Sequence, residues 1–294
     1  MTDPSVDAAT PAISVVIPTL NRDGRLLGTL ESLTAQTIGR DRFEVIPVLD
    51  AATTSGTDVS VDSFAADHPD LRLRAVRSAG SGINAARNAG IREAAGSVVV
   101  FLDDDEVAPG DHLERAWRLL EAHPDVPGVG GPARARDADG LPTCPRCAIG
   151  EATVAVDASG LSDRLLGGNM AVRRPVFDEV GLFDERLSGR GDEVEWFARQ
   201  ARKDFLYEDE LYIWHRRDGF TARELCRTAF RHGRALPLFR LQTGDAGHAS
   251  VARVARFVAH GVTKRCVNGF VLAARETGDL LAGWRLAVTR WRTS

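Results

Sequence analysis

Short apolar runs alternate with helix-like segments along the first hundred residues of this chain. The runs at residues 13–17, 43–49 and 97–102 are rich in valine and isoleucine, which is typical of strands buried in a mostly parallel sheet. Four leucines between residues 26 and 33 recur with helical spacing, and residues 83–95 have the composition of a further helix. This order predicts an α/β open sheet, and such sheets bind ligands beyond the carboxyl ends of their strands.

One residue disturbs the strand pattern. Pro47 lies within the second apolar run and has no backbone N–H to donate to a neighbouring strand. It therefore predicts that residues 43–49 form an edge strand or carry a bulge. Residues 71–76 are predicted to add another strand to the same sheet.

Composition places the chain among globular proteins. With 294 residues, 44% of them hydrophobic, it can bury a large core. No apolar run approaches the roughly 18 residues that span a bilayer, and residues 1–10 lack the pattern of a signal peptide. The four scattered cysteines fit a reducing compartment, so we expect a cytoplasmic protein. Cys144 and Cys147 form a CxxC without a second pair or suitably spaced histidines, which favours an ordinary loop over a metal or redox site.

Charge is distributed unevenly along the sequence. Residues 216–294 carry 15 Lys and Arg against 5 Asp and Glu, a balance of +10, so the net charge of −4 leaves −14 for residues 1–215. The basic segment has the pattern of amphipathic helices, which by default pack on the rest of the protein. Such helices can also contact an anionic membrane surface, here the inner face of the membrane. No nucleic-acid-binding motif accompanies the basic residues, and we expect no nucleic-acid partner.

Four consecutive acids follow the apolar run that ends at Leu102. In extended backbone Asp103 and Asp105 project to one side and Asp104 to the other. Carboxylates held this close repel each other, and a divalent cation such as Mg²⁺ or Mn²⁺ between them relieves the repulsion. The alternative is a solvated acidic turn after a strand.

Polar residues also follow the first two predicted strands. Pro18, Thr19, Asn21 and Arg22 come after the first, and Asp50 comes directly after the second. Their position suits a nucleotide, although each alone could equally be a turn residue or a helix cap. The glycine-rich segment at residues 79–90 matches neither a dinucleotide fingerprint nor a P-loop.

Taken together and in this order, these pieces resemble the family-2 glycosyltransferases of the GT-A fold. The resemblance rests on PTLNR, Asp50, the GINAARNAGI segment and FLDDDE, followed by GGNMAVRR at residues 167–174, and it covers roughly residues 12–216. It implies a nucleotide-binding, open, mostly parallel sheet flanked by helices, to which the amphipathic pattern of the basic segment adds a C-terminal helical extension.

The resemblance and the sequence pattern of the C-terminal part together predict a domain organisation. Residues 1–11 would form a flexible N-terminus and residues 12–236 the catalytic domain. Within that domain, residues 12–106 would bind the nucleotide sugar and residues 107–236 would face the acceptor. Residues 237–294 would form the basic helical extension.

The resemblance further implies a nucleoside-diphosphate sugar as donor and a divalent metal, Mg²⁺ or Mn²⁺, as cofactor. Asp50 would lie near the base and Arg87 near the nucleotide or its phosphates, beside the residues that follow the first strand. Asp105 would be the main metal ligand, helped by His215, although a lone histidine is more often structural. Asp103 or Asp104 would hold ribose or sugar hydroxyls, and Asp103 is also a candidate metal ligand. Family members commonly have two acids after the second strand where this chain has one, so the preferred base stays open.

The acceptor side would involve residues of the middle segment. Asn169, Met170 and Arg173 would lie near the donor sugar or the acceptor, whose identity the sequence leaves open. Trp196 could stack on a sugar ring. Met170 and Trp196 are equally suited to the hydrophobic core.

The catalytic base is expected at Asp192 or Glu193. The family motif usually reads Glu-Asp and is reversed here. Asp192 and Glu195 have the spacing of a capping box, which leaves Glu193 free, and Glu193 also matches the family's base by position. It would take a proton from the acceptor hydroxyl during a single displacement that inverts the anomeric carbon.

Two functions of other classes stay open at this point. A nucleotidyltransferase shares a similar sheet but needs metal carboxylates and no base for an acceptor hydroxyl. A non-catalytic nucleotide-sugar-binding protein would have no reason to keep both the acids and Glu193. Fold resemblance alone does not decide between these functions.

Overall fold

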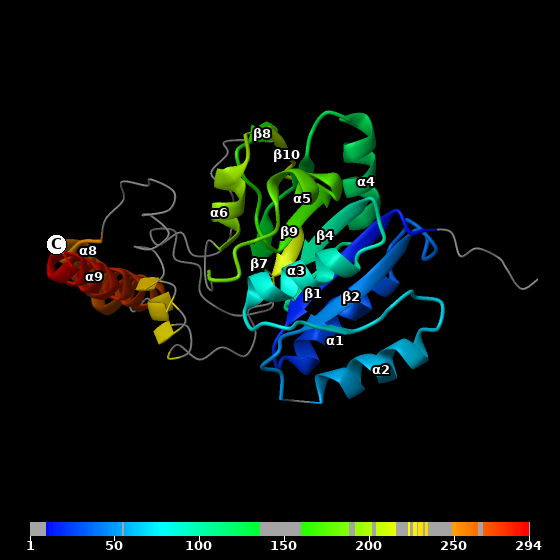
Figure 1. Cartoon of the computed structure of the whole chain (residues 1–294). Coiled ribbons are helices and arrows are strands. Elements are labelled where there is room, and N and C mark those ends of the chain that lie inside the picture. Colours follow the sequence, from blue (N-terminus) through cyan, green and yellow to red (C-terminus); the bar gives the residue numbers. More distant parts are fainter. Residues whose placement is uncertain are drawn as a thin grey trace, which may run out of the picture. The chain divides into compact units, whose positions relative to one another are not determined.

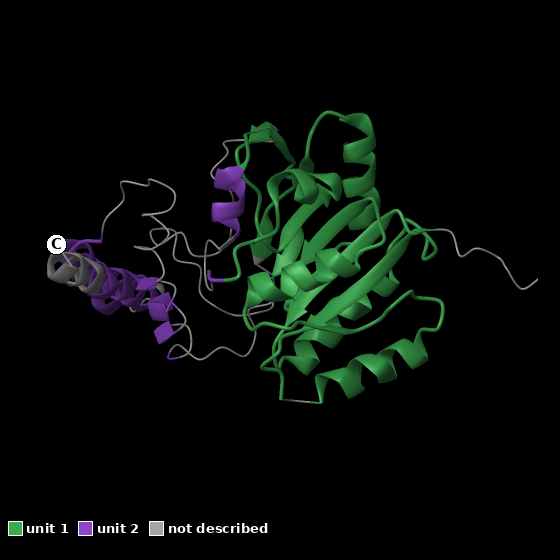
Figure 2. Cartoon of the chain, in the orientation of Figure 1, with its two compact units in different colours: residues 1–134, 153–185, 200–215 green, residues 135–152, 186–199, 216–294 purple. Residues whose placement is uncertain are grey.

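The structure is a computed structural model of the chain. It describes residues 10–54, 56–135, 160–187, 192–201, 204–215, 249–263 and 267–293, together with single positions between 223 and 234. The chain divides into two compact units (Figure 2). Unit 1 comprises residues 1–134, 153–185 and 200–215, and unit 2 comprises residues 135–152, 186–199 and 216–294.

An eight-stranded sheet forms the centre of unit 1 in the part of the chain that the structure describes (Figure 1). Its order is β3-β2-β1-β4-β9-β6-β10-β8. Pairing is parallel from β3 to β4 and between β6 and β10, whereas β9 runs antiparallel to β4 and β6, and β8 to β10. The strands are β1 (Ile13–Thr19), β2 (Phe43–Leu49), β3 (Val76–Arg77), β4 (Val98–Leu102), β6 (Gly128–Gly130), β8 (Gly160–Ser162), β9 (Asn169–Arg173) and β10 (Phe205–Tyr207).

Helices alternate with the strands in unit 1, as the sequence predicts. Every residue of β1, β2 and β4 is buried, which explains their continuous apolar runs. The leucine-rich segment is helical, with Leu26, Leu30 and Leu33 in the core. The α/β prediction is therefore confirmed. The helices are α1 (Asp23–Thr34), α2 (Thr57–Asp67), α3 (Ile83–Glu93), α4 (His112–Ala122) and α5 (Pro175–Val180).

The edge position predicted from Pro47 is wrong. β2 has β1 on one side and β3 on the other, and Pro47 pairs in regular register with Ile17. The strand beyond β2 is shorter than predicted, because only a bridge at Leu73 precedes β3, which begins at Val76. The fold tolerates the missing N–H of Pro47 because the pairing of β2 with the segment that contains Leu73 and β3 is interrupted at this position.

A small second sheet lies beside the acidic run. It pairs β5 (Glu106–Val107) with β11 (Ile213–His215), which in turn neighbours β7 (Ala133–Ala135). The β5–β11 pairing is antiparallel and places His215 opposite Glu106. Residues more than 100 positions apart in the sequence are thereby brought together.

Unit 2 contains helices α6 (Asp192–Arg199), α8 (Val251–Thr263) and α9 (Val267–Thr293). The pair α8–α9 packs closely, since a Cβ on Gly269 would lie 2.6 Å from the backbone nitrogen of Gly261. No helix in the described residues is long and apolar enough to cross a membrane. Cys144 and Cys147 lie outside the described residues, as does most of the N-terminal segment 1–11.

Close packing of α3 on the sheet gives a test of this fold. A Cβ on Gly90 would overlap Cγ1 of Val16 in β1 and lie 2.9 Å from Cγ2. We expect Gly90→Ala to lower the free energy of unfolding by about 1–3 kcal/mol through overpacking. Gly24→Ala in α1 is the matched control, because nothing lies within 4 Å of its Cβ position. That variant should be neutral or stabilised by about 0.5–1 kcal/mol. Urea unfolding of both variants measures the difference, and equal stabilities would contradict the packing.

Candidate functional site

The carboxyl ends of the first parallel strands meet at one edge of the large sheet. β1 ends with Pro18 and Thr19, and the neighbouring β4 ends at Leu102, directly before the acids. β9 runs in the opposite direction, so its first residue, Asn169, pairs with Leu102 at the same edge. The edge that the sequence predicts for ligand binding therefore collects the acids.

Asp104 is held by the last residue of β1 and by a residue of the loop that follows it. Its side chain is almost fully buried, with the Thr19 hydroxyl donating to one carboxylate oxygen at 2.8 Å and the Arg22 guanidinium to the other at 2.9 Å. Burial raises the pKa of Asp104 to about 6, and the neighbouring charge of Asp105 adds to the increase. The Arg22 charge and the Thr19 hydrogen bond act in the opposite direction. These contacts tie the first strand end to the acidic run.

Asp105 is surrounded by basic groups. Arg22 and Arg25 each place a guanidinium nitrogen 3.2 Å from its Oδ2. On the other side, Nε2 of His215 lies 3.4 Å from Oδ1. The predicted pairing of Asp105 with His215 thus corresponds to close neighbours in the structure. Arg25 is absent from the sequence-based prediction, although its place one turn after Arg22 on α1 is a signal that could have identified it.

Glu106 fixes the backbone turn that carries the three aspartates. It is 2% exposed, and its Oε2 accepts the backbone N–H of Asp103 at 2.7 Å. Its carbonyl oxygen accepts the Thr29 hydroxyl at 2.7 Å. Burial raises the pKa of Glu106 well above its usual range, with the charge of Asp103 as the next cause. This supporting role of Glu106 is absent from the sequence-based prediction.

Gly168 comes close to the same turn. A Cβ at this position would lie 2.5 Å from Oε1 of Glu106 and 2.9 Å from Oδ2 of Asp103. Glycine leaves the space that these two carboxylates occupy. The GGN segment therefore contributes to the site by its lack of a side chain.

Asp50 accepts backbone hydrogen bonds at the end of β2. It is buried, and its carboxylate accepts the N–H groups of Ala52, at 2.7 Å, and Gly82, which precedes α3. This is the turn-residue role that the sequence left open as an alternative. Asp50 still lies at the predicted edge, because it follows Leu49, which pairs with Thr19.

Asn21 and Arg87 both make contacts within the protein. Asn21 has a positive φ of 51° and accepts the backbone N–H of Thr54 at 2.9 Å, which joins the loops after β1 and β2. Arg87 is buried, with a nitrogen 3.3 Å from Oδ1 of Asn84 and its guanidinium 5.6 Å from the ring centre of Phe183. Its predicted nucleotide contact stays a prediction.

The structure corrects the expectation for Arg173. This residue lies at the far end of β9, paired with Val98, whereas the acids follow the opposite end of β4. Its guanidinium binds the backbone oxygens of Leu120, at 2.6 Å, and Val126, at 3.0 Å. Arg173 therefore anchors the end of α4 and does not reach the acidic run.

Asn169, Met170 and Trp196 are also buried. The Asn169 amide donates to the carbonyl oxygens of Pro132 and Leu211, at 3.2 and 2.7 Å, which links β9 to the small sheet. Met170 pairs with Phe101 inside the large sheet. Trp196 packs edge-on against Phe197. For Met170 and Trp196 these contacts favour the core alternative.

The two candidate bases lie at the start of α6. This helix begins at Asp192, and Glu195 forms an ion pair with Arg199 at 2.7 Å. The Asp192 side chain lies outside the described residues. Since α6 belongs to unit 2, the choice of Glu193 over Asp192 stays a prediction.

The donor set at Asp105 fits a divalent cation in part. Mg²⁺ and Mn²⁺ take few protein ligands when water and phosphate complete their coordination. Asp105 and His215 offer an oxygen and a nitrogen 3.4 Å apart, close enough to share one ion. Within the described residues, no group of three His, Cys, Asp or Glu is arranged to hold a metal alone. The pair therefore suits an ion that a phosphate-bearing ligand also coordinates.

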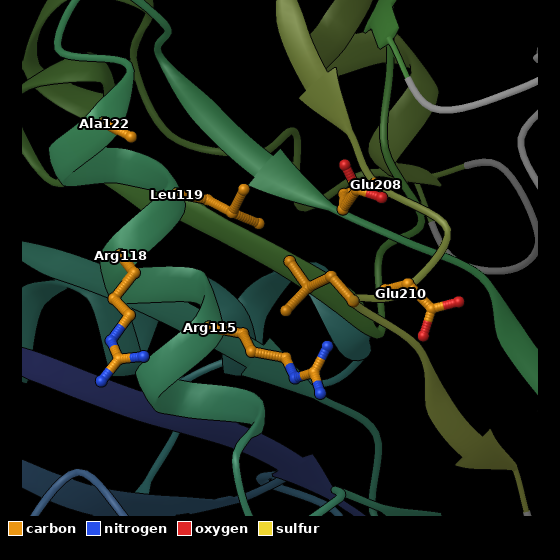
Figure 3. A pocket seen from close by; sticks show the side chains of 7 residues that line it. Arg115, Arg118, Leu119, Ala122, Glu208 and Glu210 are labelled. Carbon is orange, nitrogen blue, oxygen red and sulfur yellow. The ribbon is translucent and has the colours of Figure 1, made fainter.

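A separate cavity of about 400 Å³ lies beside α4 (Figure 3). Charged and apolar side chains share its wall, and none of them is a predicted site residue. Its lining consists of Arg115, Arg118, Leu119, Ala122, Glu208, Glu210 and Leu211.

Comparison with known families identifies the chain. The model of "Glycosyl transferase family 2" matches residues 14–181, more than half of the sequence. The chain belongs to glycosyltransferase family 2. The matched range contains the carboxyl ends of β1 and β4, the acidic run and the GGN segment of this family-2 protein.

One curated relative and two solved structures are similar to the chain. Glycosyltransferase AglE of Haloferax volcanii is 29% identical over 191 residues, spanning 64% of this chain and 61% of AglE. The mannosyltransferase PcManGT of Pyrobaculum calidifontis, solved with GDP-Man and Mn²⁺, has a TM-score of 0.63 at 19% identity, covering 93% of this chain and 87% of that one. S. aureus TarS, solved with UDP-GlcNAc, has a TM-score of 0.58 at 15% identity, covering 94% and 92%. These structural likenesses confirm the GT-A fold of the family-2 chain.

Proposed function

We propose that this family-2 protein is a metal-dependent, inverting glycosyltransferase. It would transfer a sugar from a nucleoside-diphosphate sugar to an acceptor hydroxyl. The observation that carries the proposal is the meeting of Asp104, Asp105 and His215 at the carboxyl edge of a GT-A sheet. Open α/β sheets bind their ligands at this edge.

The donor would bind over the ends of β1, β2 and β4. Thr19 ends the first strand, Asn21 and Arg22 follow it, and Asp50 follows the second strand. Solved relatives hold GDP-Man and UDP-GlcNAc, which supports a nucleotide sugar without choosing the base. Arg22 and Arg25 supply positive charge next to the acids, where the negative diphosphate would lie.

Asp105 and His215 would hold the divalent cation, with Asp103 and Asp104 as neighbouring carboxylates. Mn²⁺ accompanies GDP-Man in the PcManGT structure, which supports this cofactor. A cation bound here supplies positive charge that stabilises the nucleoside diphosphate as it leaves. Glu106 holds the acidic turn by accepting the N–H of Asp103, and Gly168 leaves room for the carboxylates of Glu106 and Asp103.

Glu193 would act as the general base. Its carboxylate takes the proton of the acceptor hydroxyl while that oxygen bonds to the anomeric carbon and the bond to the diphosphate breaks. One displacement inverts the anomeric configuration. The cysteine usage of the chain supports a cytoplasmic location for this reaction.

A donor screen tests the proposal. Thermal unfolding is followed with UDP-, GDP- and dTDP-sugars, each with Mn²⁺ or with EDTA. A ligand that binds only the folded state raises the unfolding temperature, so one nucleotide family should stabilise the protein in the presence of metal. The absence of a shift with every donor, or equal shifts with Mn²⁺ and EDTA, would overturn the metal–diphosphate site.

A further inference from the structure

Exposed hydrophobic side chains concentrate on the C-terminal helix pair. Among the described residues, five of the eight large hydrophobic side chains that are exposed lie on α8 and α9. Scattered exposed hydrophobic residues need no explanation, but a group on one pair of helices does. The five are Val251, Val258, Val262, Phe270 and Leu281.

Three of these residues form a valine stripe along α8. Val251, Val258 and Val262 are 73%, 40% and 63% exposed. They are separated by seven and four residues, which puts them on the same face of the helix. At a rise of 1.5 Å per residue the stripe is about 17 Å long.

Residues of α8 between the valines contact α9. Arg253 forms an ion pair with Glu276 at 2.7 Å, and Gly261 lies against the ring of Phe270. At about 100° per residue, both of these α8 residues lie on a different face of the helix from the valine stripe. An exposed apolar stripe of this kind is typical of a binding surface.

The charge of this segment identifies the kind of partner. Residues 249–294 contain eight Lys and Arg against two Asp and Glu, and Arg256 is exposed on α8 itself. A second copy of the chain would bring two strongly basic segments together, which like-charge repulsion opposes. An anionic lipid surface attracts the basic residues and accepts the apolar stripe. No described helix is suited to span the bilayer, so the contact would be peripheral.

We propose that α8 docks on an anionic lipid bilayer, with the valine stripe inserted at the boundary between head groups and acyl chains. Basic residues of the segment contact the lipid phosphates. The proposal concerns where the protein binds and does not depend on the donor chemistry. It is consistent with an acceptor presented at a membrane surface.

Vesicle co-sedimentation of the full chain tests this docking. Vesicles of phosphatidylcholine alone are compared with vesicles that also contain phosphatidylglycerol. We expect binding to the anionic vesicles only, weakened by 0.5 M salt. The double variant Val258→Ser and Val262→Ser should bind about tenfold more weakly, because membrane affinity scales with buried apolar area.

A matched control uses the other unit. Val59 on α2 is 69% exposed, and Val59→Ser should leave vesicle binding unchanged. Arg256→Gln provides a second variant that keeps the stripe and should weaken binding to anionic vesicles. Circular dichroism and light scattering check that each variant folds and keeps its oligomeric state.

Several results would overturn the proposal. One is no sedimentation of the unmodified chain with anionic vesicles. Another is equal vesicle binding by the serine double variant and the Val59→Ser control. Dimers that dissociate on serine substitution would assign the stripe to a second copy. A large loss of thermal stability in the double variant, without vesicle binding by the unmodified chain, would assign it to packing within the protein.

Discussion

Replacing Asp105 with asparagine is expected to lower the rate of sugar transfer by at least about a hundredfold. Asp105 is the carboxylate that faces His215 on one side and Arg22 and Arg25 on the other. The neutral amide would be a poor ligand for Mg²⁺ or Mn²⁺, and the charge that stabilises the leaving diphosphate would be lost. Initial rates with the donor found in the thermal screen, measured over a range of Mn²⁺ concentrations, give the size of the effect.

The matched control is Asp58→Asn on α2. The Asp58 side chain is 54% exposed and lies 3.9 Å from Arg77, so its removal should change the rate by less than about twofold. The proposed role of Asp105 would be contradicted by an Asp105→Asn enzyme with an unchanged rate and an unchanged Mn²⁺ dependence. Circular dichroism of both variants separates a lost ligand from a lost fold.

Replacing Glu193 with glutamine is expected to lower kcat by about 10²–10⁴-fold, the usual contribution of a general base. Glutamine keeps the size of the side chain but cannot accept the proton of the acceptor hydroxyl. Binding of the nucleotide donor should stay unchanged, because the base acts on the acceptor. Single-turnover rates and donor-induced thermal shifts, measured on the same preparation, separate the two effects.

Asp192→Asn is the comparison that decides between the two acids at the start of α6. We expect it to lower the stability of the helix by about 1 kcal/mol at most, since an acid at this position favours the helix N-terminus, and to leave kcat nearly unchanged. A large loss of kcat in Asp192→Asn together with a small one in Glu193→Gln would reverse the assignment.

The strands and first helices of the sheet could be predicted because their signals are local. Buried parallel strands need continuous apolar runs, and α1 needs leucines on one face, so both patterns appear directly in the sequence. The order of β1, α1, β2 and β4 also placed the acidic run at the edge where ligands bind. The edge position predicted from Pro47 was wrong because the residues around a proline do not show which strands lie beside its own strand.

The contacts of the site depended on pairing between distant segments. Arg22 and Arg25 lie about 80 positions from the acids they bind, and His215 reaches Asp105 through the pairing of β11 with β5. Arg173 looked like a site residue until the antiparallel direction of β9 placed it at the other end of the sheet. An arginine in the sequence does not indicate in which direction its strand runs.

The sequence by itself therefore determined the α/β layout, the acidic run and the family resemblance, because each of these depends only on short stretches of neighbouring residues. Only the tertiary structure decided that Glu106 and Gly168 shape the acidic turn and that Asp50 binds backbone N–H groups. The reason is physical. Burial and hydrogen bonding assign a polar side chain its role, and both depend on which distant segments the fold brings into contact.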